Sequence, residues 1–346
     1  MSFQTAWQSP SNIALVKYWG KTHPQLPTNP SLSMTLDACR TETSVEIIPG
    51  GGKLQVWVDG VDTPSFVPKV AAFFKAIAER HPWTAHFDWR IQTHNTFPHS
   101  SGIASSASGM SALALCVVSL AREFQERIPA KDDLREASVL ARLGSGSASR
   151  SVYGGWVVWG RTPSVPGSNQ EWAHPYPHAV DPVFSDFRDT VLLVDVGQKA
   201  VSSTVGHGLM NGHPFAEARF ATAHDNLAAF QPILSSGDVG SFLALAEREA
   251  LMLHGLMMAS NPPFVLMKPE TLAILEKIQN ARRDGLEVGF TLDAGANVHV
   301  LYPARAEQSV REFVTTSLSA HCKDGACIHD RVGTGPQQLT KPKLLL

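Results

Sequence analysis

The feature that most constrains this chain is a loop rich in glycine and serine, residues 98–109, which leads directly into a strongly apolar helical segment, residues 110–126. The start of a helix presents unpaired backbone N–H groups and the positive end of the helix dipole, and both attract anions. Gly102 lets the backbone approach a phosphate closely, and the serines supply hydroxyl donors. We therefore predict a phosphate-binding loop without the Walker lysine, because no G-x-x-x-x-G-K-[ST] motif occurs. The alternative is an ordinary capped helix after a polar linker.

A second segment rich in glycine and serine, residues 144–151, contains a cation at Arg150. The planar guanidinium group matches the oxygens of a phosphate or a carboxylate, so this segment is a second candidate anion site. A solvated turn with a surface arginine is the alternative. The segment has no G-x-S-x-G motif, so a serine hydrolase, suggested only by the abundant serines, lacks a nucleophile elbow.

Near the N-terminus, residues 11–21 combine an apolar strand pattern with two lysines. Alternation along a strand places Lys17, Trp19 and Lys21 on one side. Tyr18 then faces the other side. A lysine at the end of an apolar strand is costly to bury unless it meets an anion. Taken alone, such a lysine pair is more often a solvated sheet edge.

A carboxylate, Asp293, lies in a tight turn between two short predicted strands, residues 289–292 and 298–302. An aspartate in such a turn is usually structural, because it can cap its own backbone. Beside a bound phosphate, the same carboxylate would act as a general base or would orient a reacting hydroxyl.

The order of the predicted elements indicates two lobes. Strands occupy most of the first third of the chain, and helices dominate from residue 215 to residue 283. This order favours an α+β fold over a doubly wound parallel sheet. We place an N-terminal lobe at residues 1–185, a C-terminal lobe at 186–332 and a loose tail at 333–346.

The composition is that of a globular chain, with 43% hydrophobic and 17% charged residues among 346 and a formal net charge of −2. So small a charge argues against a partner recognised by bulk charge, such as nucleic acid or an anionic membrane. The N-terminus has no signal peptide pattern, and no apolar run is judged long enough to span a bilayer, so we expect a cytoplasmic protein. Four cysteines are too few for a disulfide framework, and we expect Cys39 and Cys116 to be buried free thiols.

Four separated segments together resemble one family: residues 11–21 followed by 26–29, residues 95–109, residues 144–155 and residues 291–299. They are similar to the diphosphomevalonate decarboxylases of the GHMP kinase superfamily. The resemblance implies an α+β, two-lobed GHMP kinase fold with a deep active-site cleft. In that fold the N-terminal lobe is like the second domain of a small-subunit ribosomal protein, and the C-terminal lobe is ferredoxin-like.

The reaction implied by the resemblance uses ATP and Mg²⁺ to decarboxylate mevalonate 5-diphosphate to isopentenyl diphosphate, a step of isoprenoid biosynthesis. The tertiary alcohol is phosphorylated first, and the phosphate then leaves as the carboxylate fragments. Such chemistry needs a γ-phosphate in line with the alcohol and stabilisation of a carbocation-like centre. The implied partner is this small molecule, with no nucleic acid and no membrane. A homodimer is expected by analogy alone.

The resemblance also assigns roles to matching positions. Asp293 would orient or deprotonate the alcohol, Lys17 would lie beside it, and Arg150 would hold the substrate carboxylate. Ser106 would aid phosphate transfer. The diphosphate and the reacting end would be held or lined by Asn12, Tyr18, Trp19, Lys21, Ser145, Ser147 and Ser203. ATP would be held by His99, Ser100, Ser101, Gly102, Ile103, Ala104, Ser105 and Lys199, and no metal ligand is assigned.

Two segments depart from the usual family pattern. His99-Ser100-Ser101 replaces Thr-Ala-Ala, and Val205-Gly206-His207-Gly208 replaces a run that contains Gly-Met. His99 either contacts the nucleotide or caps the loop, and we favour the cap. The departures leave nucleotide preference and substrate open, so a mevalonate 3-kinase and a phosphomevalonate decarboxylase are the rivals within the superfamily. The rival from another class is a catalytically silent nucleotide-binding protein.

Overall fold

The computed structural model describes residues 2–98, 103–125, 133–197, 201 and 203–340. Within these ranges a large sheet contains β1 (Phe3–Val16), β4 (Ser31–Pro49), β5 (Leu54–Val58), β6 (Val61–Asp62), β7 (Phe87–Asn95), β8 (Trp156–Trp159), β9 (His174–Pro175) and β14 (Gln337–Gln338). Its order is β14-β1-β4-β7-β5-β6, with β8 pairing β4 and β9 pairing β8. Only the β5–β7 pair in this sheet is parallel among the described strands, which confirms the predicted α+β class.

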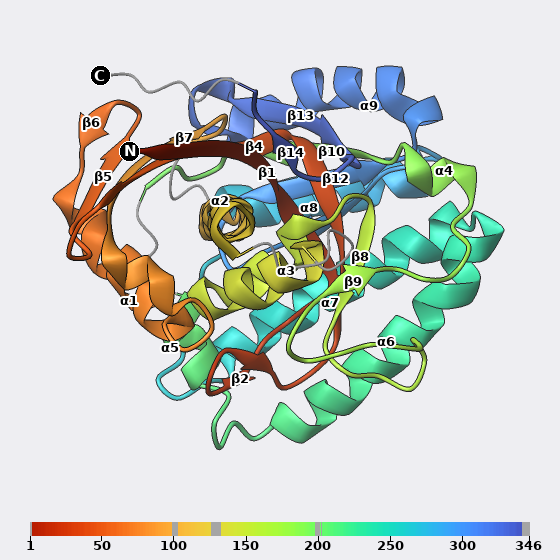
Figure 1. Cartoon of the computed structure of the whole chain (residues 1–346). Coiled ribbons are helices and arrows are strands. Elements are labelled where there is room, and N and C mark those ends of the chain that lie inside the picture. The colour runs from red at the N-terminus through yellow and green to blue at the C-terminus, as the bar shows by residue number, and fades with distance from the viewer. Residues whose placement is uncertain (1, 99–102, 126–132, 198–200, 202, 341–346) are drawn as a thin grey trace.

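Helices α1 (Val67–Ile77) and α2 (Ser105–Gln125) pack against the large sheet, and α3 (Asp133–Gly144) packs on these two helices. Figure 1 shows α2 end-on beneath the sheet, with α3 beside it. One face of α1 is apolar, and its Val70, Phe73 and Ile77 join the core with strand residues of β4. Helix α2 begins at Ser105, earlier than the predicted residue 110, so its first turn forms part of the Gly/Ser segment.

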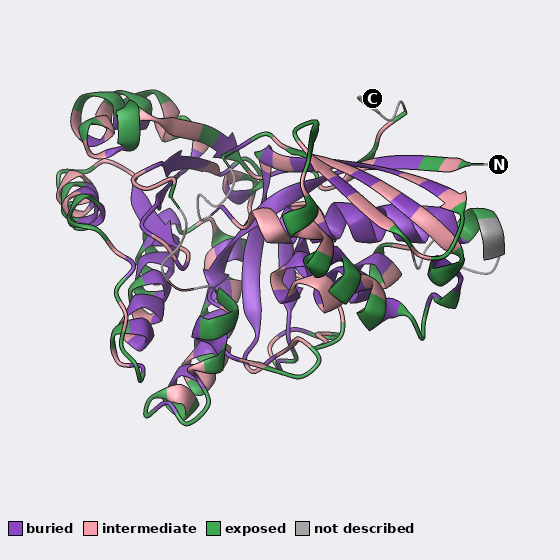
Figure 2. Cartoon of the chain, turned by 90° about the vertical axis from the view of Figure 1, so that its left-hand side faces the viewer, coloured by how far each residue is buried: buried purple, intermediate pink, exposed green. Residues whose placement is uncertain are grey.

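Helix α2 also corrects one expectation about the chain. Its segment Ser105–Glu123 is long and apolar enough, by length and composition, to cross a membrane, with a mean hydropathy of 1.2. The window is 72% buried inside the fold, however, because α2 lies between the sheet and α3. A buried core helix passes the same test as a membrane span, and Figure 2 shows how burial is concentrated in the interior elements.

A four-stranded antiparallel sheet forms the second framework, in the order β11-β12-β10-β13. Its strands are β10 (Arg188–Leu192), β11 (Gly289–Leu292), β12 (Val298–Tyr302) and β13 (Cys327–Arg331). The accompanying helices are α4 (Pro182–Ser185), α5 (Ser203–Gly208), α6 (Ala216–Ser236), α7 (Val239–Met258), α8 (Pro269–Arg283) and α9 (Glu307–Phe313). The two strands predicted on either side of Asp293 are confirmed with their bounds.

The segment after β13 is part of the large sheet, so the prediction of a loose tail is wrong for residues 333–340. Strand β14 pairs with β1, with Gln337 opposite Gln8. The backbone N–H of Leu339 donates to the carbonyl of Ala6 in β1 at 2.9 Å, and that of Gly333 donates to the carbonyl of Thr35 in β4 at 2.8 Å. The segment thus covers the part of the β1 edge near Trp7 and Gln8.

Two local predictions near the candidate site are also corrected. Strand β1 ends at Val16, and a short β2–β3 hairpin, Lys21–Thr22 and Leu26–Pro27, follows. Alternation therefore does not continue through residues 17–21. The second Gly/Ser segment is not an open loop, because Gly146–Val152 forms a 3₁₀ helix with most of its residues buried. Cys39 and Cys116 are buried free thiols, as predicted.

Candidate active site

A cavity of about 550 Å³ lies where the end of β1, the start of α2 and the turn after β11 meet. Residues from both predicted lobes line it. The predicted site residues among them are Tyr18, Trp19, Lys21, Ala104, Ser105, Ser106, Ser145, Ser147, Arg150, Ser203 and Asp293. Segments that are far apart in the sequence thus share one pocket, as the resemblance implied.

Lys17 lies immediately beside this cavity, with its side chain only 1% exposed. Its Nζ is 4.0 Å from Oδ1 of Asp293 and donates to the carbonyl of Ala14 at 2.5 Å. Burial lowers the pKa of Lys17 from 10.5 to about 8, and the Asp293 carboxylate opposes that shift. The ammonium group is poorly solvated, and its one carboxylate partner is distant. A second anion, such as a phosphoryl group, would therefore stabilise its positive charge.

The Asp293 carboxylate points toward this ammonium group and does not cap its own turn. Its side chain is 34% exposed, and its contact with Lys17 is the one polar contact of the carboxylate among the described residues. The turn is closed instead by the backbone, since Gly295 N–H donates to the Asp293 carbonyl at 2.7 Å. Nε2 of His254 contacts the same carbonyl at 3.1 Å. This arrangement favours the reading of Asp293 as a reactive group over the structural reading.

Arg150 is held by two hydrogen bonds from its guanidinium group. Nε donates to Oδ1 of Asn12 at 3.1 Å, and Nη1 donates to Oγ of Ser31 at 2.6 Å. Burial lowers the pKa of Arg150 to about 10, and the nearby Asp293 carboxylate opposes the shift, so the group remains a cation at neutral pH. Asn12 therefore lies behind Arg150 and orients it, whereas the prediction had Asn12 lining the cleft.

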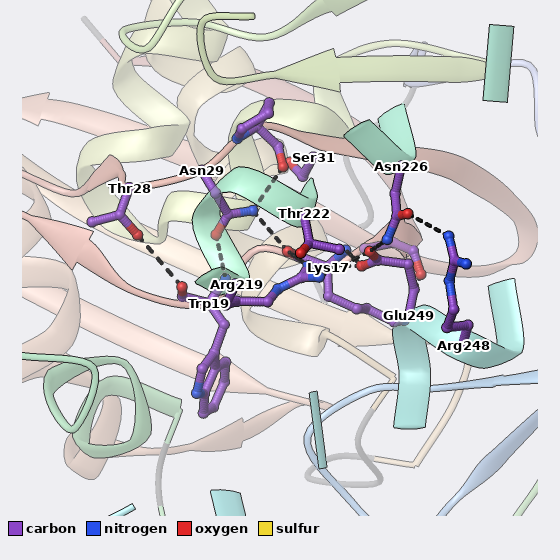
Figure 3. A network of polar contacts seen from close by, with 12 residues as sticks. Lys17, Trp19, Thr28, Asn29, Ser31, Arg219, Thr222, Asn226, Arg248 and Glu249 are labelled. Carbon is purple, nitrogen blue, oxygen red and sulfur yellow. Dashed lines mark hydrogen bonds and ion pairs between the residues drawn. The ribbon is translucent and has the colours of Figure 1, made fainter. Parts of the chain in front are cut away.

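The backbone of Lys17 is fixed by a buried network from α6 and α7 (Figure 3). Its N–H donates to Oε2 of Glu249 at 2.8 Å, and its carbonyl accepts from Arg219 at 2.8 Å. Arg219 also donates to both carboxylate oxygens of Glu249, at 2.8 and 2.7 Å. Asn29 donates to the Lys17 carbonyl at 2.9 Å, and Asn226 donates to Glu249. A buried ion pair between α6 and α7 thus positions the residue that follows β1.

Aromatic rings form the wall next to Lys17. The ring of Tyr18 lies 4.8 Å from that of Trp159 and 4.3 Å from that of His207. Its buried hydroxyl has no partner among the described residues, and burial raises its pKa. A Cβ at Gly146 would lie 2.9 Å from this hydroxyl, so any larger residue at position 146 would clash with Tyr18 in its present position. Both Tyr18 and Trp19 line the cavity, and the predicted opposite orientation of Tyr18 is wrong because β1 ends at Val16.

The other end of the cavity is walled by the large sheet and by α1. Its lining residues there are mostly apolar or hydroxyl-bearing: Thr41, Thr43, Val56, Val58, Phe66, Val70, Ile91 and Thr93. Ala104, Ser105 and Ser106 bring the first turn of α2 to the same space, and Oγ of Ser106 is 3.4 Å from Oγ of Ser145. Flat apolar walls beside a helix start suit a base and its phosphates.

The remaining predicted site residues are Ile103, Ser203 and those that lie outside the described part of the chain. Ile103 is buried in a core cluster, and its carbonyl accepts from Ser11, so its side chain packs the loop and does not line the cavity. His99, Ser100, Ser101 and Gly102 lie outside the described residues, as does Lys199. Ser203 lines the cavity from the first turn of α5.

Two family models match this chain. The diphosphomevalonate decarboxylase-like N-terminal domain matches residues 9–169, and the mevalonate 5-diphosphate decarboxylase C-terminal domain matches residues 190–339. The diphosphomevalonate decarboxylase of Candida albicans is 30% identical, over 87% of this chain and 85% of its own length. The chain belongs to the diphosphomevalonate decarboxylase family.

Solved structures of this family have the same fold. Mevalonate diphosphate decarboxylase from Staphylococcus aureus is 26% identical, with a TM-score of 0.85 over 98% of both chains. MDDEF in complex with MVAPP, AMPPCP and magnesium is 28% identical, with a TM-score of 0.84 over 99% of this chain and 100% of the other. The predicted GHMP kinase fold is therefore confirmed.

Three residues of this family member were given no role from its sequence. His207 was noted only as a departure from the pattern, although it lines the cavity. Glu249 and Arg219 were not singled out at all. The sequence does mark Glu249 as unusual, because it is a charged residue among Ala246, Ala250 and Leu253 on the buried side of α7. A charge within an apolar stripe indicates a buried pair, but the stripe does not identify the partner.

Proposed function

We propose that this chain catalyses the ATP- and Mg²⁺-dependent decarboxylation of mevalonate 5-diphosphate to isopentenyl diphosphate, in isoprenoid biosynthesis. One observation carries the proposal. The Asp293 carboxylate lies 4.0 Å from Nζ of Lys17 in a pocket that Arg150 and the first turn of α2 also line. The diphosphomevalonate decarboxylases among its relatives, and the MDDEF complex with MVAPP and AMPPCP, support the choice of substrate and nucleotide.

In the first step Asp293 orients the tertiary hydroxyl and accepts its proton, while the hydroxyl oxygen bonds to the γ-phosphorus of ATP and ADP leaves. Lys17 then lies where it can neutralise charge on the transferring phosphoryl group. Asp293 is suited to the first role because its carboxylate is open to the cavity and is not used as a backbone cap.

In the second step the C–O bond to the new phosphate breaks with its electron pair, and the bond to the carboxylate breaks to form the alkene and carbon dioxide. Arg150 binds the carboxylate before it fragments, and its own orientation is set by Asn12 and Ser31. The diphosphate lies toward Tyr18 and Lys21, whose side chains line the same wall.

Mg²⁺ suits this site because the cavity offers oxygen donors and a bound nucleotide would supply more. The described residues include no group of three or more His, Cys, Asp or Glu side chains placed to hold a metal by themselves. Magnesium is commonly bound through substrate phosphates with few protein ligands, and the Ser106 hydroxyl would hold it here. When bound, the ion neutralises phosphate charge.

The test is an assay of the full chain with ATP, Mg²⁺ and, in turn, mevalonate, its 5-phosphate and its 5-diphosphate. Carbon dioxide and inorganic phosphate are measured together. We expect equal release of both from the 5-diphosphate and little from the other two compounds. Phosphoryl transfer without carbon dioxide would identify a 3-kinase, turnover of the 5-phosphate would identify a phosphomevalonate decarboxylase, and nucleotide binding without turnover would identify a silent protein.

A further inference from the structure

His207 is the cavity residue that the proposed reaction leaves without a role. It lies in α5, within the segment where the chain departs from the usual family pattern. Its ring packs against those of Tyr18 and Trp19, with centroid distances of 4.3 and 4.6 Å. The side chain is buried and yet lines the cavity together with Lys21.

The protonation state of this imidazole follows from its contacts. The backbone N–H of Gly20 donates to Nδ1 of His207 at 2.9 Å, so Nδ1 is an acceptor and carries no proton. Burial, together with the positive charge of Lys21, lowers the pKa of His207 to about 3, and the ring is therefore neutral. The single ring proton then lies on Nε2.

Nε2–H is a donor that no described residue of the chain uses. Among the described residues, His207 makes one side-chain hydrogen bond, the one that Nδ1 accepts. The two flanking aromatic rings limit rotation of the imidazole, so the direction of Nε2–H is set before any ligand arrives. A donor oriented in advance binds an anionic oxygen with little loss of conformational entropy.

We propose that His207 is a substrate-binding residue whose Nε2–H donates to a phosphate oxygen at the C5 end of the substrate. The inference rests on the proposed function, because Tyr18 and Lys21 are the positions expected to hold the diphosphate. The ring of His207 packs against that of Tyr18, and the positive charge of Lys21 contributes to the lowered pKa of His207. A neutral donor at this place adds a directed hydrogen bond without adding a further cation to Lys17, Lys21 and Arg150.

Two amide substitutions separate this role from simple packing. In His207→Gln the side-chain amide nitrogen reaches the place of Nε2, so the donor is retained and the acceptor for Gly20 is lost. In His207→Asn the amide oxygen takes the place of Nδ1, so the Gly20 contact is retained and the donor is lost. The KM for mevalonate 5-diphosphate and the affinity for it without ATP, from calorimetry, are measured in both variants.

We expect His207→Asn to bind mevalonate 5-diphosphate about tenfold more weakly than His207→Gln, the size typical of a hydrogen bond to a charged group. The KM for ATP should differ little between the two variants. Equal affinities, or tighter binding by His207→Asn, would overturn the proposal and leave His207 as a packing residue. His207→Met, which fills similar space without a donor, should match the asparagine variant if the proposal holds.

Turnover of mevalonate 5-diphosphate by the unaltered chain distinguishes failure of this proposal from failure of the proposed function. If the unaltered chain does not turn over mevalonate 5-diphosphate, the proposed function fails before the variants are compared. If the unaltered chain decarboxylates it normally and the two amide variants do not differ in the expected direction, the function stands and only the role of His207 is lost. Thermal unfolding of each variant confirms that the compared proteins are folded.

Discussion

The two ends of the cavity are built in different ways. At the reacting end, Lys17 and Arg150 are almost fully buried, and their positions depend on hydrogen bonds from distant segments. At the nucleotide end, the wall consists mainly of side chains from the large sheet, from the segment that leads into α1 and from the first turn of α2. Chemistry requires fixed charges from both lobes, whereas recognition of a flat base requires mainly shape. Changes at the reacting end should therefore lower turnover and leave nucleotide binding largely intact.

The largest effect is expected for Asp293→Asn, which keeps the shape of the side chain and removes its charge. Turnover should fall by about 10³-fold, since a positioned general base is worth that order. Nucleotide affinity should be nearly unchanged, because the apolar wall and the start of α2 are untouched. Carbon dioxide release and calorimetric binding of a nonhydrolysable ATP analogue give the two readouts. If Asp293→Asn turns over substrate at the parental rate, Asp293 has no catalytic role. If the variant no longer binds the nucleotide, the two ends of the cavity do not act independently.

Arg150→Lys should have the next largest effect. A lysine cannot donate to Asn12 and Ser31 and still offer a fork to a carboxylate. We expect kcat/KM for mevalonate 5-diphosphate to fall about 100-fold, with a smaller change in the KM for ATP. The matched control is Arg282→Lys, which alters a similar arginine fork paired with Glu247 outside the cavity. A normal rate in Arg150→Lys, or an equal loss in the control, would contradict the assignment.

A smaller effect is expected for Glu249→Gln, which weakens the support of the Lys17 backbone. Glu247→Gln on the same helix is a matched control, since Glu247 is also buried and paired with an arginine but lies away from the cavity. Both variants should lose stability, by about 3 kcal/mol where a fully buried pair is broken. Only Glu249→Gln should also lower kcat, by about tenfold, in protein shown to be folded. If kcat is equal in the two variants, the network of Figure 3 stabilises the fold and does not affect catalysis.

Near neutral pH, the smallest effect is expected from a change of pH. The pKa of Lys17 is lowered to about 8, so the ammonium form predominates below that pH and is lost as the pH rises through it. The kcat/KM for mevalonate 5-diphosphate should therefore fall above about pH 8, by up to tenfold per pH unit. In Lys17→Arg the charge persists, and the fall should move to higher pH even if the rate is lower. If kcat/KM still falls above about pH 8 in Lys17→Arg, the fall is caused by the titration of another group.

Sequence patterns predicted the elements that depend on local periodicity. The strands on either side of Asp293 are short apolar runs separated by a turn, and their bounds were found correctly. Local patterns could not show where β1 stops, because the Lys17 N–H is bonded to Glu249, which lies 232 positions further along. The role of Asn12 depends likewise on Arg150, 138 positions away. The resemblance brought the catalytic residues together, and only the structure showed which of them touch the cavity and which support it.

The pairing of β14 with β1 has a consequence for biosynthesis. Gln8 and Gln337 contact each other across 329 positions, so the edge of the first strand at Trp7 and Gln8 lacks its β14 partner until residue 337 has been made. During that interval a nascent chain carries an open backbone edge that can pair with a neighbouring chain on the same messenger RNA. The arrival of β14 thus removes one open backbone edge from the newly made molecule.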